Sequence, residues 1–400
     1  MKDLDALATP RALFLTPEAP YPLAGGGAVR SASLLEYLSG RYAVDVLVFR
    51  EPGAPDPTGS LPRHLARDVR VLDLPLHSNA PFPRLARNAG RLFRGTPPLN
   101  DRFAGFASVV RDYLRDRHYD LAVIEHFWCA PYWDAIAPHA RVMVLDMHNL
   151  ESVLMSRLAE TASWPAASAY RRFAKVSLEL ERRWLPRFSL LLAASDQDAA
   201  RLRDIAPHSR VCVYPNAIPG VPAPNVSQEH VIAFSGNLEY HPNIDAVRYF
   251  HGRIWPLLRR RWPNLVWRLI GKNPEAVSRY VRGDPRIQFS GPVDNAVEAL
   301  AAAQVAVVPL RAASGTRVKI LEAWAAVRPV VSTTIGAEGL DARHGEHLLL
   351  AGTPEGFCEA VSSLLESAQL RERLGLGGRR LYEEQFTWQA AWARLAQAGF

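Results

Sequence analysis

Short apolar runs alternate with helical stretches along the whole 400-residue chain. The runs are ALFLT, VDVLVF, VRVLDL, LAVIEH, VMVLD, LLLAAS and VCVY in the first half, and VIAFSG, VWRLIG, IQFSG, VAVVPL and PVVST in the second. Strand–helix alternation of this kind is typical of parallel sheets covered by helices on both faces. Because one open sheet would not comfortably hold so many strands, we expect an α/β protein with two doubly wound parallel-sheet domains.

The boundary between the two domains is expected in YPNAIPGVPAPN, residues 214–225. Four prolines and a glycine stand there between two predicted strands, a composition typical of a linker. We therefore expect an N-terminal domain over residues 1–215 and a second domain over residues 216–382. Residues 383–400 end in the amphipathic pattern FTWQAAWARLAQAGF, and we expect a helix there that packs back on the N-terminal domain.

Composition excludes several classes of protein. A hydrophobic content of 48% against 22% charged residues is typical of a packed globular chain rather than a disordered one. The three cysteines, Cys129, Cys212 and Cys358, are far apart in sequence, so neither a zinc site nor a disulfide framework is indicated. No secretory signal is visible, and no apolar run reaches the roughly 18 residues that a membrane span needs. A cytoplasmic location is therefore expected.

The net charge of +7 is compatible with nucleic acids, anionic membranes or phosphorylated ligands as partners. No basic stripe interleaved with aromatic residues is present, so we expect no nucleic-acid partner. Nearly all of the 47 basic residues are arginines, a bias that reflects genome composition as much as binding. The exceptions are Lys2, Lys175, Lys272 and Lys319, and their rarity makes each of them a candidate for a specific role.

The segment SGTRVKILEAWA, residues 314–325, combines an anion site with a carboxylate. A helix is predicted to begin near Thr316, and free N–H groups at a helix start bind anions. Arg317 and Lys319 add positive charge, and Glu322 lies three residues beyond Lys319 on the same helical face, where it could accept hydrogen bonds from ribose hydroxyls. The alternative is a surface Lys–Glu pair on an amphipathic helix, worth roughly 0.3–0.5 kcal/mol.

Three consecutive glycines, Gly25, Gly26 and Gly27, follow the first predicted strand and precede the helix AVRSASLLEYL, which contains Arg30. Glycines between a strand and a helix let the backbone approach a phosphate or a sugar closely. The spacing is not that of a dinucleotide-binding G-x-G-x-x-G motif. A flexible strand–helix loop is an equally good interpretation.

Histidines follow two of the predicted strands of the first domain. His126 ends LAVIEH, and His148 follows VMVLD in the segment LDMHNLES. Because the carboxyl ends of parallel strands meet at one edge of a sheet, where open α/β sheets bind ligands, these histidines are candidate ligand contacts. A lone histidine is more often structural, but two at equivalent strand ends favour a site.

The sequence Asp196-Gln197-Asp198 resembles the D-x-D motif that holds a divalent metal in some sugar transferases. We favour a different role, because Ser195 is expected to cap a helix whose first turn contains both aspartates. No metal site is therefore expected.

PFPRLARNAGRLFRG, residues 81–95, is predicted to form a basic amphipathic helix that Gly95 ends. Four arginines share one face and five apolar residues lie on its flank; these are Arg84, Arg87, Arg91 and Arg94, and Phe82, Leu85, Ala89, Leu92 and Phe93. Such helices bind anionic membrane surfaces. The alternative is a surface helix whose apolar side faces the core and whose arginines are solvated.

In order along the chain, the segments FSGNLEYHPNIDAVRYF, LIGKNPE, FSGPVDN, VVPLRAASGTRVKILEAWA, RPVVSTTIGAEGL and the terminal FTW resemble the landmarks of glycosyltransferase family 4, the retaining GT-B enzymes of the glycosyl transferases group 1 type. The resemblance is strongest over residues 231–390, and GGG and DMHNLES fit the same pattern in the first domain. It implies a GT-B fold, in which two Rossmann-like domains face each other across a cleft.

The resemblance also implies roles for particular residues. The family's Glu-x7-Glu pair falls on Ser314 and Glu322, so the ribose ligand is present and the usual sugar ligand is replaced by serine. The donor-domain loop that carries Arg and Lys in many relatives has no basic residue here, which leaves the diphosphate to Lys319 with help from Arg317 or Lys272. The implied donor-binding residues are Gly26, Gly27, Gly236, Asn237, Lys272, Val293, Ser314, Gly315, Thr316, Arg317, Lys319 and Glu322.

The implied reaction is retaining transfer of a sugar from a nucleotide diphosphate sugar, with His148, Lys319, Arg317 and Glu322 as the catalytic group. Arg30, His126 and His148 are assigned to the acceptor side. The acceptor would be a glycan, a lipid-linked sugar or a small molecule, as in polysaccharide biosynthesis, and no cofactor beyond the donor is expected. Peripheral contact with the inner face of an anionic membrane fits the basic helix. The alternatives are a non-catalytic nucleotide-sugar-binding protein and an epimerase or phosphorylase on the same fold.

Overall fold

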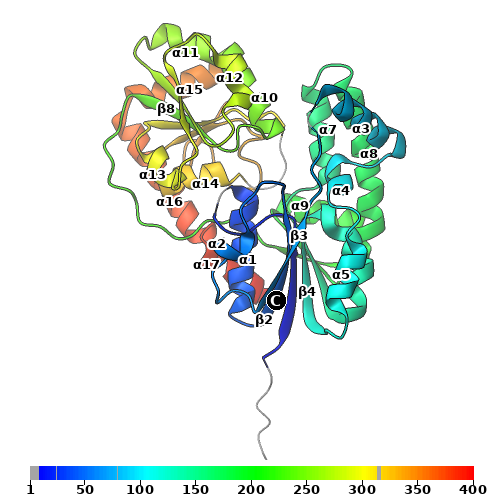
Figure 1. Cartoon of the computed structure of the whole chain (residues 1–400). Coiled ribbons are helices and arrows are strands. Elements are labelled where there is room, and N and C mark those ends of the chain that lie inside the picture. Colours follow the sequence, from blue (N-terminus) through cyan, green and yellow to red (C-terminus); the bar gives the residue numbers. More distant parts are fainter. Residues whose placement is uncertain (1–8, 24, 79, 313–316) are drawn as a thin grey trace, which may run out of the picture. The chain divides into compact units, whose positions relative to one another are not determined.

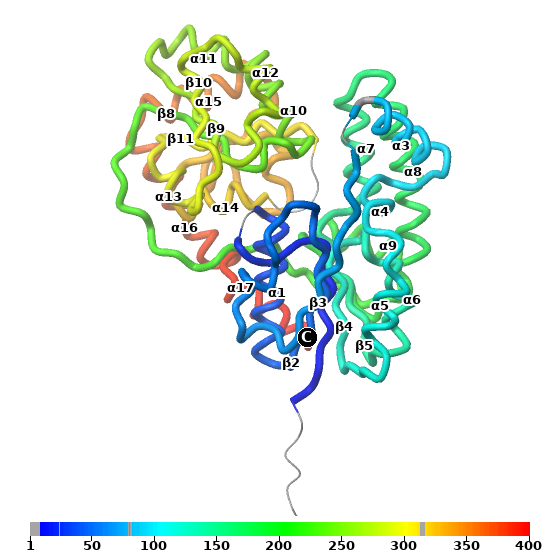
Figure 2. The backbone as a smooth tube through the Cα atoms, viewed as in Figure 1, coloured from blue at the N-terminus to red at the C-terminus, as the bar shows by residue number. Residues whose placement is uncertain are grey.

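The computed structural model describes residues 9–23, 25–78, 80–312 and 317–400. Its described residues fall into two compact units. The first unit comprises Met1–Met155 and Ser168–Tyr214, and the second comprises Ser156–Ala167 and Pro215–Phe400. The elements of each unit can be followed by their labels in Figure 1 and along the backbone in Figure 2.

The first unit is built on a seven-stranded sheet in which all neighbouring strands are parallel. The strand order is β3-β2-β1-β4-β5-β6-β7, so the direction of winding reverses between β1 and β4. The strands are β1 (Arg11–Thr16), β2 (Ala43–Arg50), β3 (Asp68–Asp73), β4 (Tyr119–Glu125), β5 (Ala140–Met147), β6 (Leu190–Ala193) and β7 (Arg210–Val213).

Helices lie between these strands in sequence. They are α1 (Gly26–Ser39), α2 (Pro57–Ser60), α3 (Pro81–Arg94), α4 (Pro98–Arg102), α5 (Ala107–Leu114), α6 (Trp133–Ile136), α7 (Glu151–Thr161), α8 (Ala166–Trp184) and α9 (Asp196–Ile205), with 3-10 turns at Phe127–Tyr132, Ala137–His139 and Leu185–Arg187. Among the described helices, none combines the length and the apolar character needed to cross a bilayer.

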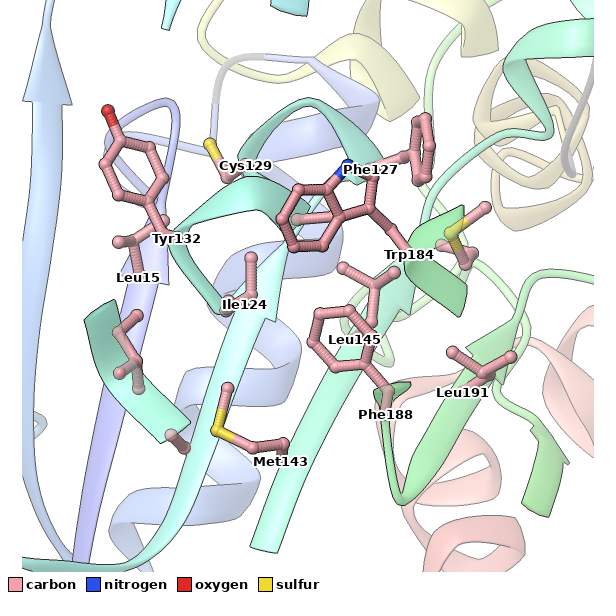
Figure 3. Close-up of a cluster of buried hydrophobic side chains, with 14 of the residues drawn as sticks. Leu15, Ile124, Phe127, Cys129, Tyr132, Met143, Leu145, Trp184, Phe188 and Leu191 are labelled. Atoms are coloured by element: carbon pink, nitrogen blue, oxygen red, sulfur yellow. The ribbon is translucent and has the colours of Figure 1, made fainter. Parts of the chain in front are cut away.

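The central strands β1, β2, β4 and β6 are buried on both faces, as expected for a covered parallel sheet, whereas β3 and β7 at the two edges are partly exposed. One face of the sheet contributes Ile124 of β4, Leu145 of β5 and Leu191 of β6 to a buried apolar cluster. Trp184 and Phe188 belong to the same cluster (Figure 3). Burial of one such apolar side chain stabilises the fold by about 1.5–3 kcal/mol. The central strands can therefore expose polar groups only near their ends.

The second unit repeats this plan with a six-stranded parallel sheet of order β10-β9-β8-β11-β12-β13, which reverses between β8 and β11. The strands are β8 (Val231–Ser235), β9 (Val266–Ile270), β10 (Ile287–Gly291), β11 (Val305–Val308), β12 (Val330–Ser332) and β13 (Leu349–Leu350). The helices are α10 (His241–Tyr249), the π-helical turn Phe250–Ile254, α11 (Trp255–Arg261), α12 (Glu275–Val281), α13 (Ala296–Ala301), α14 (Val318–Ala325), α15 (Pro354–Glu366), α16 (Ala368–Gln385) and α17 (Trp388–Gln397).

The expectation of two doubly wound parallel sheets is confirmed, and all twelve apolar runs form strands. β13 was not predicted, because two residues carry no readable pattern. Residues 383–400 form the end of α16 and α17 within the second unit, and a β-bridge joins Thr387 to Ile218. Packing of this segment on the N-terminal domain stays a prediction.

Close approach of α16 to α14 depends on glycine. A Cβ at Gly378 would overlap the indole of Trp324, the buried centre of α14, and a Cβ at Gly375 would lie 2.5 Å from the carbonyl oxygen of Val327. Side-chain atoms at these positions would push the two helices apart. The position of α14 therefore depends on residues of α16 that have no side chain.

We expect Gly378→Ala to lower the free energy of unfolding of the second unit by about 1–3 kcal/mol, the usual cost of forcing an atom into a packed core. Urea unfolding followed by fluorescence measures the change. Gly252→Ala is the matched control, because nothing lies within 4 Å of its added Cβ. Equal stability of the two variants would contradict the packing argument.

Candidate functional site

The carboxyl edge of the first sheet gathers charged side chains that are shielded from solvent. His148 follows β5, and its Nε2 atom lies 2.5 Å from Oε2 of Glu125, the last residue of β4, and 3.3 Å from Oδ2 of Asp146. All three side chains are buried. This edge lies beside the point where the strand order reverses, the usual ligand position of open α/β sheets.

Arg30 of α1 holds the other side of this group. Its guanidinium donates to both carboxylate oxygens of Asp146, at 2.7 and 2.5 Å, and to the carbonyl oxygen of Tyr214 at 2.6 Å. The side chain is 1% exposed, so these bonds form away from water, where a charge-assisted fork is strong. Arg30 therefore acts on this edge through Asp146, which it fixes in orientation.

The charges of this cluster, defined as Arg30, Glu125, Asp146 and His148, set its protonation. Burial by itself lowers the pKa of His148, but the carboxylates of Glu125 and Asp146 outweigh it and raise the pKa to about 9. Burial, with the nearby charge of Asp146, raises the pKa of Glu125. Burial opposes ionisation of Asp146 as well, but Arg30 and His148 lower its pKa.

Ligand atoms of Glu125, Asp146 and His148 lie within 4.8 Å of one another, a spacing that a metal ion could use. Arg30 and a protonated His148 already balance the two carboxylates in charge, and the Arg30 fork takes up both oxygens of Asp146. A cation would have to displace these bonds. The cluster thus balances its own charges, although Oε1 of Glu125 has no hydrogen-bond partner among the described residues, and its chemistry suits the holding of a protonated imidazole.

His126 lies against this cluster. Its ring stacks on that of His148 with centroids 3.4 Å apart and on that of Trp128 at 4.2 Å, and its φ of +63° turns the chain at the end of β4. Within the described part of the chain, its buried Nε2 atom has no hydrogen-bond partner. Burial, together with the charges of His148 and Arg30, lowers the pKa of His126, so its ring is neutral at pH 7.

Gly26 and Gly27 form the first turn of α1 on the same edge. A Cβ at Gly27 would overlap the carboxylate of Glu18, and that carboxylate lies 4.0 Å from Nε2 of His126. The turn thus accommodates an acidic group beside the helix start, where the free N–H groups favour negative charge.

The second unit has its own polar cluster at the edge where β8 and β11 are neighbours. The ammonium of Lys319, on the first turn of α14, donates to Oδ1 of Asn243 at 2.6 Å and lies 4.1 Å from the ring centre of Phe234. Gly236 follows β8 with a φ of +141°, and a Cβ there would lie 3.0 Å from the Lys319 nitrogen. The glycine therefore leaves the backbone of this loop open beside the cation.

Glu322 lies one turn further along α14, and its carboxylate accepts a hydrogen bond from Ser235 at 3.2 Å. Burial raises its pKa, although Lys319 and Ser235 act in the opposite direction. Burial lowers the pKa of Lys319 to about 7, with Arg317 acting the same way and Glu322 against it. This lysine is half-buried and gains strongly from any additional anion.

The other expected donor residues divide into three groups. Arg317 is buried at the start of α14 and donates to the carbonyl oxygen of Ile335 at 3.2 Å, and Asn237 accepts from Asn243 at 2.7 Å. Lys272 is exposed after β9 and Val293 is half-buried after β10. The third group, Ser314, Gly315 and Thr316, lies outside the described residues.

Sequence reasoning missed three residues of these clusters. Glu125 holds His148, Asn243 holds Lys319, and Gly271 passes so close to the backbone of Gly236 that its Cβ would overlap it. A carboxylate ending an otherwise apolar strand run was the signal for Glu125. No signal marked Asn243, because its contact with Lys319 joins residues far apart in sequence.

The Asp196-Gln197-Asp198 segment opens α9 as expected. Ser195 accepts a hydrogen bond from the backbone N–H of Asp198 at 3.1 Å and donates to its carboxylate at 2.8 Å. The capping interpretation is therefore confirmed.

Residues 229–367 match the family described as "Glycosyl transferases group 1". The chain is also 24% identical over 138 residues to an uncharacterised 44.6 kDa protein in the cps region of Klebsiella pneumoniae. That match covers 32% of this chain and 36% of the Klebsiella protein, so the chain matches only about a third of the length of this relative.

Three solved structures share the fold over almost their whole length. Sucrose-phosphate synthase of Thermosynechococcus elongatus has a TM-score of 0.74 at 17% identity and covers 98% of each chain. Anabaena HepE in complex with UDP and glucose has a TM-score of 0.65 at 17% identity, and the Staphylococcus aureus TarM G117R mutant in complex with fondaparinux, alpha-GlcNAc-glycerol and UDP has 0.68 at 9%. Each of these two comparisons covers 97% of this chain and 99% of the other.

These likenesses and the two parallel sheets identify the fold as GT-B. Within this fold, residues 229–367 of the second unit match the glycosyl transferases group 1 family.

Proposed function

We propose that this protein is a retaining glycosyltransferase of family 4 that moves a hexosyl group from a nucleotide diphosphate sugar to a sugar-containing or small-molecule acceptor in polysaccharide biosynthesis. The observation that supports the donor most directly is the cluster of Lys319, Glu322 and Gly236. It combines a cation that gains from an anion, a carboxylate suited to ribose hydroxyls, and an open backbone, and all three lie in the segment that matches the family. UDP in the HepE and TarM structures supports a nucleoside diphosphate.

In the proposed reaction the bond between the anomeric carbon and the diphosphate oxygen breaks, and the acceptor hydroxyl oxygen bonds to that carbon on the same face. The leaving phosphate takes the hydroxyl proton. Lys319 and Arg317 stabilise the negative charge that develops on the leaving group, a preorganised electrostatic role. No carboxylate nucleophile is assigned.

His148 is proposed to hold the reacting sugar or the acceptor in register. The carboxylates of Glu125 and Asp146 keep its imidazole protonated, so it donates hydrogen bonds from a fixed orientation. His126 and Arg30 are proposed to support the acceptor side through their contacts with His148 and Asp146.

We expect Lys319→Met and Glu322→Gln each to weaken binding of UDP or another nucleoside diphosphate by about 1.5–3 kcal/mol, the value of a hydrogen bond to a charged group. This corresponds to roughly 10- to 150-fold in dissociation constant. Titration calorimetry across UDP, GDP, ADP and TDP measures it. Lys175→Met and Glu372→Gln are matched controls on exposed helix positions. Unchanged affinity in both Lys319→Met and Glu322→Gln would refute the donor site.

Proton uptake on binding distinguishes a direct contact of Lys319 with the diphosphate from a purely structural role of this lysine. With a pKa of about 7, the free lysine is mostly neutral at pH 8. A bound diphosphate raises that pKa, so binding at pH 8 takes up a proton, which calorimetry detects in buffers of different ionisation enthalpy. Proton uptake by the wild type that persists in Lys319→Met would assign it to another group.

We expect the His148 ring to titrate near pH 9 in the folded protein, well above its ordinary value of about 6.5. Because the folded pKa is raised, the stabilising contribution of the proton is complete below about pH 6.5 and is lost as the pH rises through 9. Glu125→Gln should move the midpoint down, as seen in the imidazole resonances by NMR. Glu181→Gln, an equally buried carboxylate bonded to Ser152, should not. A midpoint near 6.5 in the wild type would exclude this role of Glu125.

We expect His148→Ala to reduce turnover more than donor affinity, because a positioning contact is made mainly in the transition state. A release assay with labelled nucleotide sugar gives the rate, and calorimetry gives the affinity.

Turnover should also survive EDTA, because no step is assigned to a bound metal. Loss of activity in EDTA that magnesium or manganese restores would show that the reaction needs a metal. A wild-type protein that binds donor without hydrolysis or transfer would instead be a nucleotide-sugar-binding protein.

A further inference from the structure

Helix α3 turns its apolar side toward solvent. Phe82 is 85% exposed, Leu85 68% and Phe93 88%, and Ala86 and Ala89 on the same side are exposed as well. These positions fall at helical spacing and form one continuous stripe, which we call the α3 stripe. The alternative of an apolar side facing the core is therefore wrong for this helix.

The opposite side of α3, which carries the arginines, attaches the helix to the first unit. Arg91 is 8% exposed and donates to the carboxylate of Asp101 at 2.8 Å, and Arg94 reaches the same carboxylate at 3.2 Å. Arg172 of α8 donates to the carbonyl oxygen of Leu92 at 2.8 Å, consistent with the position of α3 beside α4 and α8 (Figure 1). The helix is thus bound through its polar side, which is the reverse of an ordinary surface helix.

An exposed stripe of this kind indicates a partner, because soluble proteins rarely leave large apolar side chains grouped on one face. The charge around the stripe indicates which partner. No acidic residue stands between Asp73 and Asp101, whereas α3 alone carries Arg84, Arg87, Arg91 and Arg94. A second copy of this chain would bring two basic helices face to face, which disfavours self-association. An anionic surface with an apolar interior satisfies both the stripe and the arginines.

We propose that α3 docks the protein on an anionic phospholipid bilayer. Phe82, Leu85 and Phe93 insert among the acyl chains at the headgroup boundary, in the manner of interfacial amphipathic helices. Exposed Arg84 extends its long side chain toward lipid phosphates, and the contacts of Arg91 and Arg94 with Asp101 keep the helix oriented. The proposal depends on the exposure and charge of α3 and holds whichever sugar the protein transfers.

The test is co-sedimentation of the purified full chain with vesicles of phosphatidylcholine alone or with about one-third phosphatidylglycerol, at low and high salt. We expect the wild type to partition onto the anionic vesicles roughly 10-fold or more better than onto neutral ones, less so at high salt. The triple variant Phe82→Ser, Leu85→Ser, Phe93→Ser should lose this binding, and Arg84→Gln should weaken the preference for anionic lipid.

The control is Val109→Ser with Val142→Ser, two exposed apolar positions elsewhere in the same unit, which should bind as the wild type does. Circular dichroism checks that the triple variant is folded, as expected for side chains that touch little of the protein. Wild-type protein that stays in the supernatant with anionic vesicles at low salt would overturn the proposal. So would a wild-type dimer in sedimentation velocity that the triple variant converts to monomer, because the stripe would then be an interface between copies.

Discussion

Parallel strand pairing governs where chemistry can occur in this protein. A parallel pair cannot be closed by a tight turn, so every strand is followed by a crossover, and the carboxyl ends of all strands in a sheet lie at one edge. The central strands are buried on both faces, which leaves only their ends for polar groups. Where the order reverses, at β1 and β4 in one sheet and β8 and β11 in the other, the crossovers diverge to opposite faces. His126 and Gly26 follow the first pair of strands, and Gly236 follows β8 of the second.

The buried cations at the two sheet edges have pKa values shifted in opposite directions. In the first sheet two cations and two carboxylates neutralise one another, and the surplus of negative charge around His148 raises its pKa to about 9. In the second sheet burial outweighs the one nearby carboxylate and lowers the pKa of Lys319 to about 7. The protein's own carboxylates therefore keep His148 protonated at pH 7. Lys319 is fully protonated at that pH only when a bound anion adds negative charge beside it. The first arrangement suits orientation of a neutral sugar, and the second suits recognition of a phosphate.

The sequence allowed the sheets to be predicted almost completely, because a buried parallel strand appears as a continuous apolar run. The histidines were found for the same reason, as polar residues ending such runs. The partners were not, because the contact of His148 with Glu125 depends on the register that sets Glu125 opposite Asp146 across β4 and β5. The helix α3 was predicted with its end at Gly95, but its orientation was not. Periodicity shows that a helix has two faces, and tertiary contacts such as the pairing of Arg91 with Asp101 determine which one turns inward.

The position of Lys319 is determined by residues without side chains. Gly271, after β9, lets that loop press against the backbone of Gly236, and Gly236 in turn lies so close to Lys319 that a methyl group would be 3.0 Å from its nitrogen. From the other side, Gly378 lets α16 approach Trp324 and so fixes the helix that carries both Lys319 and Glu322. Any larger residue at these points would move the cation or the loop beside it, because protein interiors have little free volume to absorb the added atoms. The shape of the candidate donor site is therefore fixed by packing around it, while its affinity depends on the charges of Lys319 and Glu322.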